Sequence, residues 1–120
     1  MRIPKPAPAA VKLFEDLTPS GENITLKKVF GQPAAFVNGN MFFGVFGESV
    51  FLRFSDHDRT EAERVPGFVP FEPMPGRAMR GYLVVPKLIL GNRSQARQWV
   101  ERSRSHVAGL PPKKAKPKAT

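Results

Sequence analysis

The sequence predicts an α+β fold, a two-layer domain with an antiparallel meander sheet and flanking N- and C-terminal helices. Three observations support this prediction. Apolar residues recur at helical spacing near both ends of the chain. Short runs rich in Phe and Val fill the middle. Tight-turn sequences such as Asn38-Gly39 connect these runs directly, as neighbouring antiparallel strands require.

The chain is predicted to begin with a proline-rich stretch and a helix. Residues 1–8 contain three prolines, and we expect them to be disordered. From residue 9 the apolar residues follow helical spacing as far as Leu17, and Pro19-Ser20-Gly21 is expected to end this helix.

The middle of the chain is predicted to form consecutive antiparallel strands. Asn38-Gly39 is typical of a two-residue type I′ turn, which needs positive φ at both positions. Gly47-Glu48 provides a second tight connection, and one later strand is expected to join the sheet. The predicted strands are residues 24–30, 34–38, 41–46, 50–54 and 80–85.

The run 41–46 is apolar on both faces, unlike a strand with one face in water. Strict alternation puts Met41, Phe43 and Val45 on one face and Phe42 and Phe46 on the other. Helices cover one face only. We expect the proline-rich segment 68–74 to cross over the other face without joining the sheet, to contact Phe42 or Phe46, and so to give a monomer. A homodimer packed sheet on sheet is the alternative.

Two further helices are predicted after the meander. Ser55 has the chemistry of an N-cap, and Pro66-Gly67 is expected to end the short helix that follows. Asn92 and Gln95 have capping-box spacing and open a longer helix that ends at Gly109. The buried face of that helix is predicted to contain Ala96, Trp99, Val100, Ser103 and Val107.

The 120 residues carry a formal net charge of +9, and the basic excess lies in the last third. Residues 77–120 hold eleven Lys or Arg and one acid. Such clustering suggests an anionic partner, nucleic acid first, although a solvated basic tail is the plainer interpretation.

There is no cysteine, and no apolar run approaches the roughly 20 residues that span a bilayer. We therefore expect cytoplasmic localisation and no membrane partner.

A stripe of arginines beside the apolar face of the last helix is a candidate nucleic-acid-binding surface. Lysines of segment 110–120, which we expect to be disordered, would continue it. The alternative is a solvated helix in which Arg97 pairs with Glu101. Any nucleic-acid binding is expected to be weak and sequence-independent. The candidate residues are Arg93, Arg97, Arg104, Lys113, Lys114, Lys116 and Lys118.

Gly76, Arg77 and Tyr82 form a second candidate site. Arg77 would either bind an anion or anchor its loop to carbonyls or to an acid such as Glu72.

The segment Asp56-His57-Asp58 does not predict a metal site, because adjacent side chains on a helix point in different directions. Neither a nucleophile elbow nor a phosphate loop occurs. We therefore expect no catalytic residue, metal or cofactor, and no enzymatic activity.

Four motifs follow one another along the chain: "VFG" (29–31), "FVNGNMF" (36–42), "VFLRFSD" (50–56) and "PFEPMPGRAMRGYLVVP" (70–86). With the terminal helix that carries Trp99, their order and spacing resemble the N-terminal domain of the TfoX/Sxy competence regulators over about residues 9–108. The resemblance implies a two-layer α+β domain and no established catalytic residues. Full-length family members continue into a C-terminal helical domain and promote competence gene expression alongside a transcription activator, whereas a lysine-rich segment follows here.

The sequence therefore predicts one domain, residues 9–109, that serves as a small cytoplasmic binding or regulatory module. It would act in transcription or competence regulation through a protein or nucleic-acid partner. One alternative is a direct, non-specific nucleic-acid binder that uses the arginine stripe and the lysine tail. Another is an enzyme or small-ligand-binding protein with a pocket near Arg77 and Tyr82.

Overall fold

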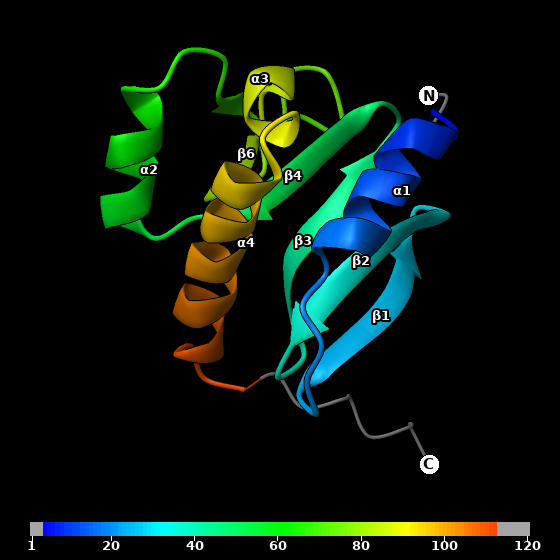
Figure 1. The fold of residues 1–120 in the computed structure, drawn as a ribbon, viewed down its shortest axis with the longest axis vertical. Helices are drawn as coiled ribbons and strands as arrows, with labels where there is room; N and C mark the ends of the chain where they lie inside the picture. Colours follow the sequence, from blue (N-terminus) through cyan, green and yellow to red (C-terminus); the bar gives the residue numbers. More distant parts are fainter. Residues whose placement is uncertain (1–3, 113–120) are drawn as a thin grey trace.

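Six antiparallel strands form one open sheet in the order β1-β2-β3-β4-β6-β5, and helices α1 and α4 lie over one of its faces (Figure 1). This computed structural model describes residues 4–112 and confirms the α+β prediction. The elements are α1 (Pro8–Leu17), β1 (Ile24–Val29), β2 (Gln32–Val37), β3 (Asn40–Phe46), β4 (Ser49–Arg53), α2 (Asp56–Glu63), β5 (Val69–Pro70), β6 (Tyr82–Val84), α3 (Lys87–Leu90) and α4 (Arg93–Ala108).

Two-residue turns join the first four strands, so the predicted meander is confirmed. Asn38 and Gly39 have φ values of 51° and 83°, as a type I′ turn requires. Phe30 and Gly31 also have positive φ, 55° and 76°, and form the turn between β1 and β2. β2 therefore begins at Gln32, two residues earlier than predicted.

A β-bulge in β3 changes which side chains face the helices. Ala35 pairs with Phe43 and Phe36 pairs with Met41, which leaves Phe42 as the extra residue. Phe42 consequently packs with Phe43 in the core on the helix side, while Met41 packs with Phe46 on the other side. The prediction of which face of the sheet Met41 and Phe42 lie on was wrong, because a bulge interrupts the strict alternation of side chains.

The helix-side core lies between β3 and the helices α1 and α4. The ring of Phe14 from α1 lies 4.8 Å from that of Phe43, centroid to centroid. From α4, the Ser103 hydroxyl donates a 2.9 Å hydrogen bond to the carbonyl of Phe42, the bulged residue. Val100 and Val107 are buried as predicted.

Trp99 is only partly buried, contrary to the prediction, because it lies beside α2 at the margin of the core. Its ring packs 5.6 Å from Phe54 and 5.1 Å from Phe68. The guanidinium of Arg102 lies 4.8 Å above the same ring and shields it on the outer side.

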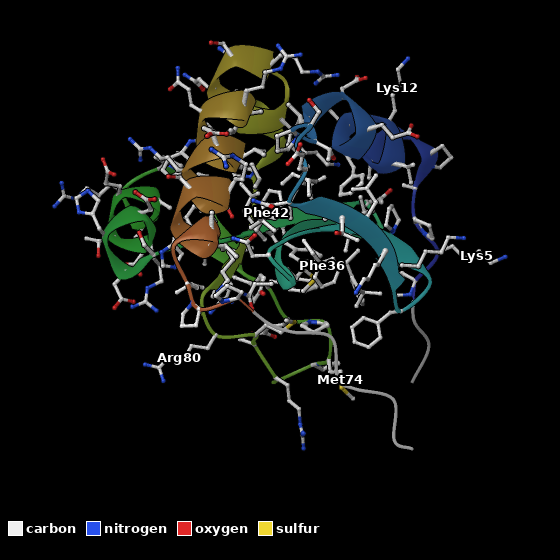
Figure 2. The ribbon with its side chains drawn as sticks, turned by 90° about the horizontal axis from the view of Figure 1, so that it is seen from below. Lys5, Lys12, Phe36, Phe42, Met74 and Arg80 are labelled. Carbon is white, nitrogen blue, oxygen red and sulfur yellow. The ribbon has the colours of Figure 1, made fainter. Side chains whose placement is uncertain are left out.

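Phe71 is the main cover of the opposite face of the sheet. It is buried and stacks on Phe51 with ring centroids 4.2 Å apart and planes at 6°. It also meets Phe46 edge to face at 5.4 Å, so the predicted contact between segment 68–74 and Phe46 is confirmed. In Figure 2 the helices α1 and α4 lie above the sheet, and the loop that carries Met74 lies below it. Cover from within the chain supports the expectation of a monomer, which stays a prediction.

The expectation that segment 68–74 crosses the sheet without joining it was wrong. Val69 and Pro70 form β5, which pairs antiparallel with β6 at the edge of the sheet. An edge strand tolerates proline because one side of its backbone needs no partner. This placement sends Phe68 to the helix side and Phe71 to the opposite side, so one short segment closes both layers.

Side-chain caps fix the ends of the helices. Ser55 accepts a 3.1 Å hydrogen bond from the N–H of Asp58 in α2, and Asn92 accepts one of 3.1 Å from the N–H of Gln95 in α4, as predicted. The short helix α3 was not predicted. At the other end of α4, Asn38 donates to the carbonyl of Ala108 at 3.4 Å, which ties the β2–β3 turn to this helix.

Gly44 is predicted to be essential for cover of the second face. A Cβ at this position would lie 2.5 Å from the ring of Phe51, which is held on its other side by Phe71. We expect Gly44→Ala to lower the free energy of unfolding by about 1–3 kcal/mol in urea titrations. Gly21→Ala is the control, since its Cβ would make an ordinary 3.6 Å contact with Ile24. Equal stability of the two variants would contradict this packing.

Ser103 is predicted to stabilise the bulge from α4. Ser103→Ala removes a buried hydrogen bond to the Phe42 carbonyl, and we expect a loss of about 1–3 kcal/mol in the free energy of unfolding. Ser105→Ala changes an exposed serine of the same helix and should alter stability by less than about 0.5 kcal/mol. A loss below that value for Ser103→Ala would show that the bond contributes little.

Candidate functional site

The predicted arginine stripe lies on α4, but two of its three arginines form ion pairs with carboxylates. Arg93 lies 3.5 Å from a carboxylate oxygen of Asp16 in α1. Arg104 holds Glu101 through two hydrogen bonds, one of them 2.8 Å from Nε to Oε2, and this bonding lowers the pKa of Glu101. Glu101 therefore pairs with Arg104 and not with Arg97, the partner that the alternative interpretation expected.

The rest of the candidate nucleic-acid surface is Arg97 and the tail. Arg97 is exposed and makes no ion pair with any residue in 4–112. Lys113, Lys114, Lys116 and Lys118 lie outside the described residues. Within the described part, the stripe therefore offers a single unengaged guanidinium.

The second predicted site separates into a turn and a core residue. Gly76 has φ 75° in a tight turn, where the N–H of Arg77 donates to the carbonyl of Met74 at 2.9 Å. The Arg77 side chain is exposed and contacts no acid or carbonyl of the described chain. Tyr82 is buried, and its hydroxyl donates to the carbonyl of Met41 at 3.0 Å. Burial raises the pKa of Tyr82, so the hydroxyl stays a donor.

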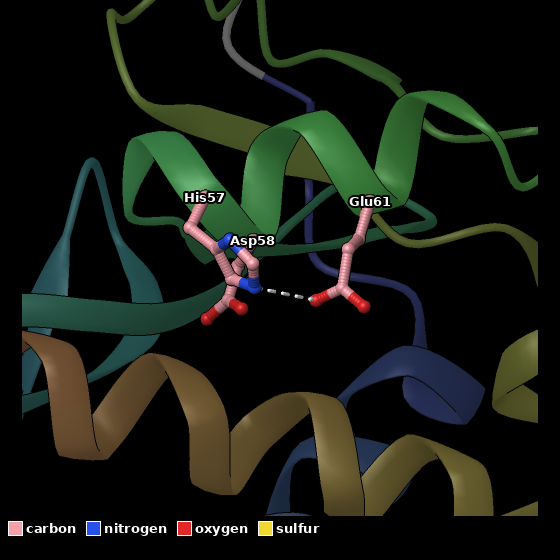
Figure 3. A group of neighbouring side chains, drawn as sticks. All are labelled: His57, Asp58 and Glu61. Atoms are coloured by element: carbon pink, nitrogen blue, oxygen red, sulfur yellow. Dashed lines mark ion pairs between the residues drawn. The ribbon is translucent and has the colours of Figure 1, made fainter.

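His57, Asp58 and Glu61 come together on the side of α2 that faces α4 (Figure 3). Their potential ligand atoms lie within 4.8 Å of one another, and Nε2 of His57 is 3.4 Å from Glu61. Arg102 of α4 already neutralises the two acids, at 3.6 Å from Asp58 and 2.8 Å from Glu61. This arrangement serves as a charged link between α2 and α4, with Arg102 stacked on Trp99.

A pocket of about 260 Å³ lies where β4 ends, and positive side chains dominate its wall. Four segments of the chain contribute to it: the end of β4, the first turns of α2, the loop before β6 and the last turn of α4. We name it the basic pocket after Arg53, Arg59, Arg80 and His106. Sequence reasoning missed it, because no spacing along the chain connects these residues.

A second concave surface follows the outer edge of the sheet. A groove of about 410 Å³ runs between α1 and β1. Its apolar wall is formed by Phe14, Pro19, Ile24 and Leu26, and its polar wall by Glu15, Thr18 and Ser20. We name it the β1 groove. Leu26 is 61% exposed there, although it is a large apolar side chain. Within residues 4–112, β1 pairs with β2 only, so its outer backbone edge is open beside this groove.

The family model of the TfoX N-terminal domain matches residues 14–107, which is most of the chain. The chain belongs to the TfoX N-terminal domain family. The resemblance seen in the four motifs is thereby confirmed. Comparison with curated proteins and with solved structures found no match.

Membership of the TfoX N-terminal domain family supports a regulatory, competence-related module. The matched region contains the β1 groove and the basic pocket, and it ends before the lysines of the tail. In the described part of this TfoX N-terminal domain, no helix is long and apolar enough to cross a membrane.

Proposed function

We propose that this TfoX N-terminal domain is a regulatory binding module without enzymatic activity, and that it acts through a protein partner that docks along β1. The observation that carries the proposal is the open edge of a six-residue strand beside a groove with one apolar wall. An unpaired edge offers a row of backbone donors and acceptors to an extended segment. The opposite edge, β5, has two residues, one of them proline, and offers no comparable row.

Alternation along β1 gives the docking surface two chemistries. Leu26 lies on the groove side, and Lys28 follows it on the same face two residues later. Lys27 points to the other face, where its amine lies 5.3 Å above the ring of Phe36. An added strand would therefore place alternate side chains against the apolar wall of the β1 groove and against lysines.

Lys27 and Lys28 indicate what kind of segment would pair with β1. Lys27 and Lys28 are both exposed, and a second copy of β1 would bring like charges together. An extended segment with an apolar residue flanked by Asp or Glu satisfies the groove and both lysines at once. The proposed partner is thus an acidic, extended segment of another protein, and the module itself stays monomeric.

Affinity capture with matched baits tests this function. We expect the wild-type protein and Leu88→Glu to retain the same partner from native cells, and Leu26→Glu to lose it. Leu88 is 82% exposed on α3 and Leu26 is 61% exposed, so both changes leave the core intact. The captured partner should also slow amide hydrogen exchange in β1. Retention by Leu26→Glu, no partner at all, or unchanged exchange in β1 would contradict the proposal.

Direct, non-specific binding to nucleic acid is the second candidate function, and the basic excess of residues 77–120 favours it. If the four tail lysines carried the binding, a salt titration with random duplex DNA would give a log–log slope of about −3.6. Truncation after Pro112 should then remove most of this slope, while it keeps the Pro111 carbonyl that accepts from Asn40 at 3.0 Å. An unchanged slope would move the binding to the folded part of the chain.

A further inference from the structure

We propose that the basic pocket is a binding site for a phosphoryl group. This inference is independent of the docking surface on β1, and it assigns a ligand class to residues that the predicted sites did not include. The ligand would be held by Arg53, Arg59, Arg80 and His106 at the end of β4.

The backbone that presents these residues is fixed by the fold. The N–H of Phe54 donates to the carbonyl of Gly81 at 2.7 Å, which joins the end of β4 to the loop before β6. Arg53 pairs with Tyr82 in the sheet register, and its guanidinium lies 5.8 Å from that ring. Ser55 caps α2, whose second turn begins with Arg59. Sheet pairing, a helix cap and a backbone hydrogen bond between neighbouring segments therefore fix the backbone positions around the pocket.

The arginines of the basic pocket have fewer acid partners than those of α4. Arg93, Arg102 and Arg104 all lie against acids, at distances given above. Arg53 and Arg80 make no ion pair with any residue in 4–112. Arg77 and Arg97 also make no ion pair within residues 4–112, but they lie apart from the pocket. Arg53 and Arg80 line one cavity together with Arg59, and an anion bound there would reduce their mutual repulsion.

Asp56 is the carboxylate that lines the pocket, and it opposes an anion. Its oxygen lies 3.6 Å from Arg59, and its side chain is fully exposed to solvent. An exposed pair at this distance is weak, so a bound anion can replace Asp56 as the partner of Arg59. Removal of the Asp56 charge should therefore strengthen anion binding.

Phosphate chemistry fits this wall better than a carboxylate does. Guanidinium groups bind phosphate oxygens in pairs, and several of them can share one tetrahedral group. Arg80 lines the pocket, and its long side chain extends outward from the protein below the end of α4 (Figure 2). At about 260 Å³ the cavity is smaller than a drug-sized site, which suits a phosphoryl group with a small attached moiety. That group could belong to a mononucleotide or to the end of an oligonucleotide.

Calorimetric titration of the full chain with inorganic phosphate and with AMP tests the site. We expect both to bind, and Arg59→Gln and Arg80→Gln to weaken binding by about 10- to 100-fold, as for a lost charged hydrogen bond. Asp56→Asn should tighten binding several-fold. Arg77→Gln and Arg97→Gln are controls of the same charge change, because both side chains are exposed and neither lines the basic pocket. The controls should change affinity by less than about twofold.

Several results would overturn the site. They are a wild-type dissociation constant above about 10 mM for both probes, equal losses in the pocket variants and the controls, and weaker binding by Asp56→Asn. Thermal unfolding of each variant shows whether the variant is folded, so that a loss of binding is not mistaken for unfolding. A short oligonucleotide with and without a 5′-phosphate then identifies the source. Preference for the phosphorylated form supports a terminal phosphate, whereas binding of AMP alone supports a small metabolite.

Discussion

β3 is the strand on which the rest of the structure depends, because it is apolar on both faces and must be covered twice. Helices α1 and α4 bury Phe42 and Phe43 on one side. On the other side, Phe71 returns from the far edge of the sheet to pack on Phe51 and Phe46. The two layers therefore share one strand, and the glycine at position 44 leaves room for the second of them.

Because both faces of the sheet are covered, the two candidate binding surfaces of this TfoX N-terminal domain lie at the margins of the sheet. The β1 groove lies at one edge, and the basic pocket lies where β4, α2 and α4 meet (Figure 1). Different elements build the two surfaces, so each can evolve or be blocked without the other. Most arginines of α4 are paired with acids and serve the fold, which leaves fewer of them for a partner than the net charge of +9 suggests.

Features that depend on neighbouring residues were predictable from the sequence. Asn38-Gly39 and the cap at Ser55 are examples, because turn and cap chemistry acts over two to four residues. The bulge at Phe42 was not predictable, since it depends on how β2 aligns with β3. β5 was missed because proline argues against a strand except at an edge. The basic pocket was missed because its residues meet only after the whole chain has folded.

A strand with two apolar faces carries little information about its own alignment. In most sheets a slip of one residue exposes apolar side chains to water, and that cost selects the correct pairing. In β3 the slip exchanges one Phe for another, so hydrophobicity alone does not distinguish the two arrangements. The choice then falls to the short turns at both ends and to the Ser103 hydroxyl at the bulge. Fidelity of folding thus rests on a few polar and glycine positions, whereas bulk stability comes from the aromatic residues around them.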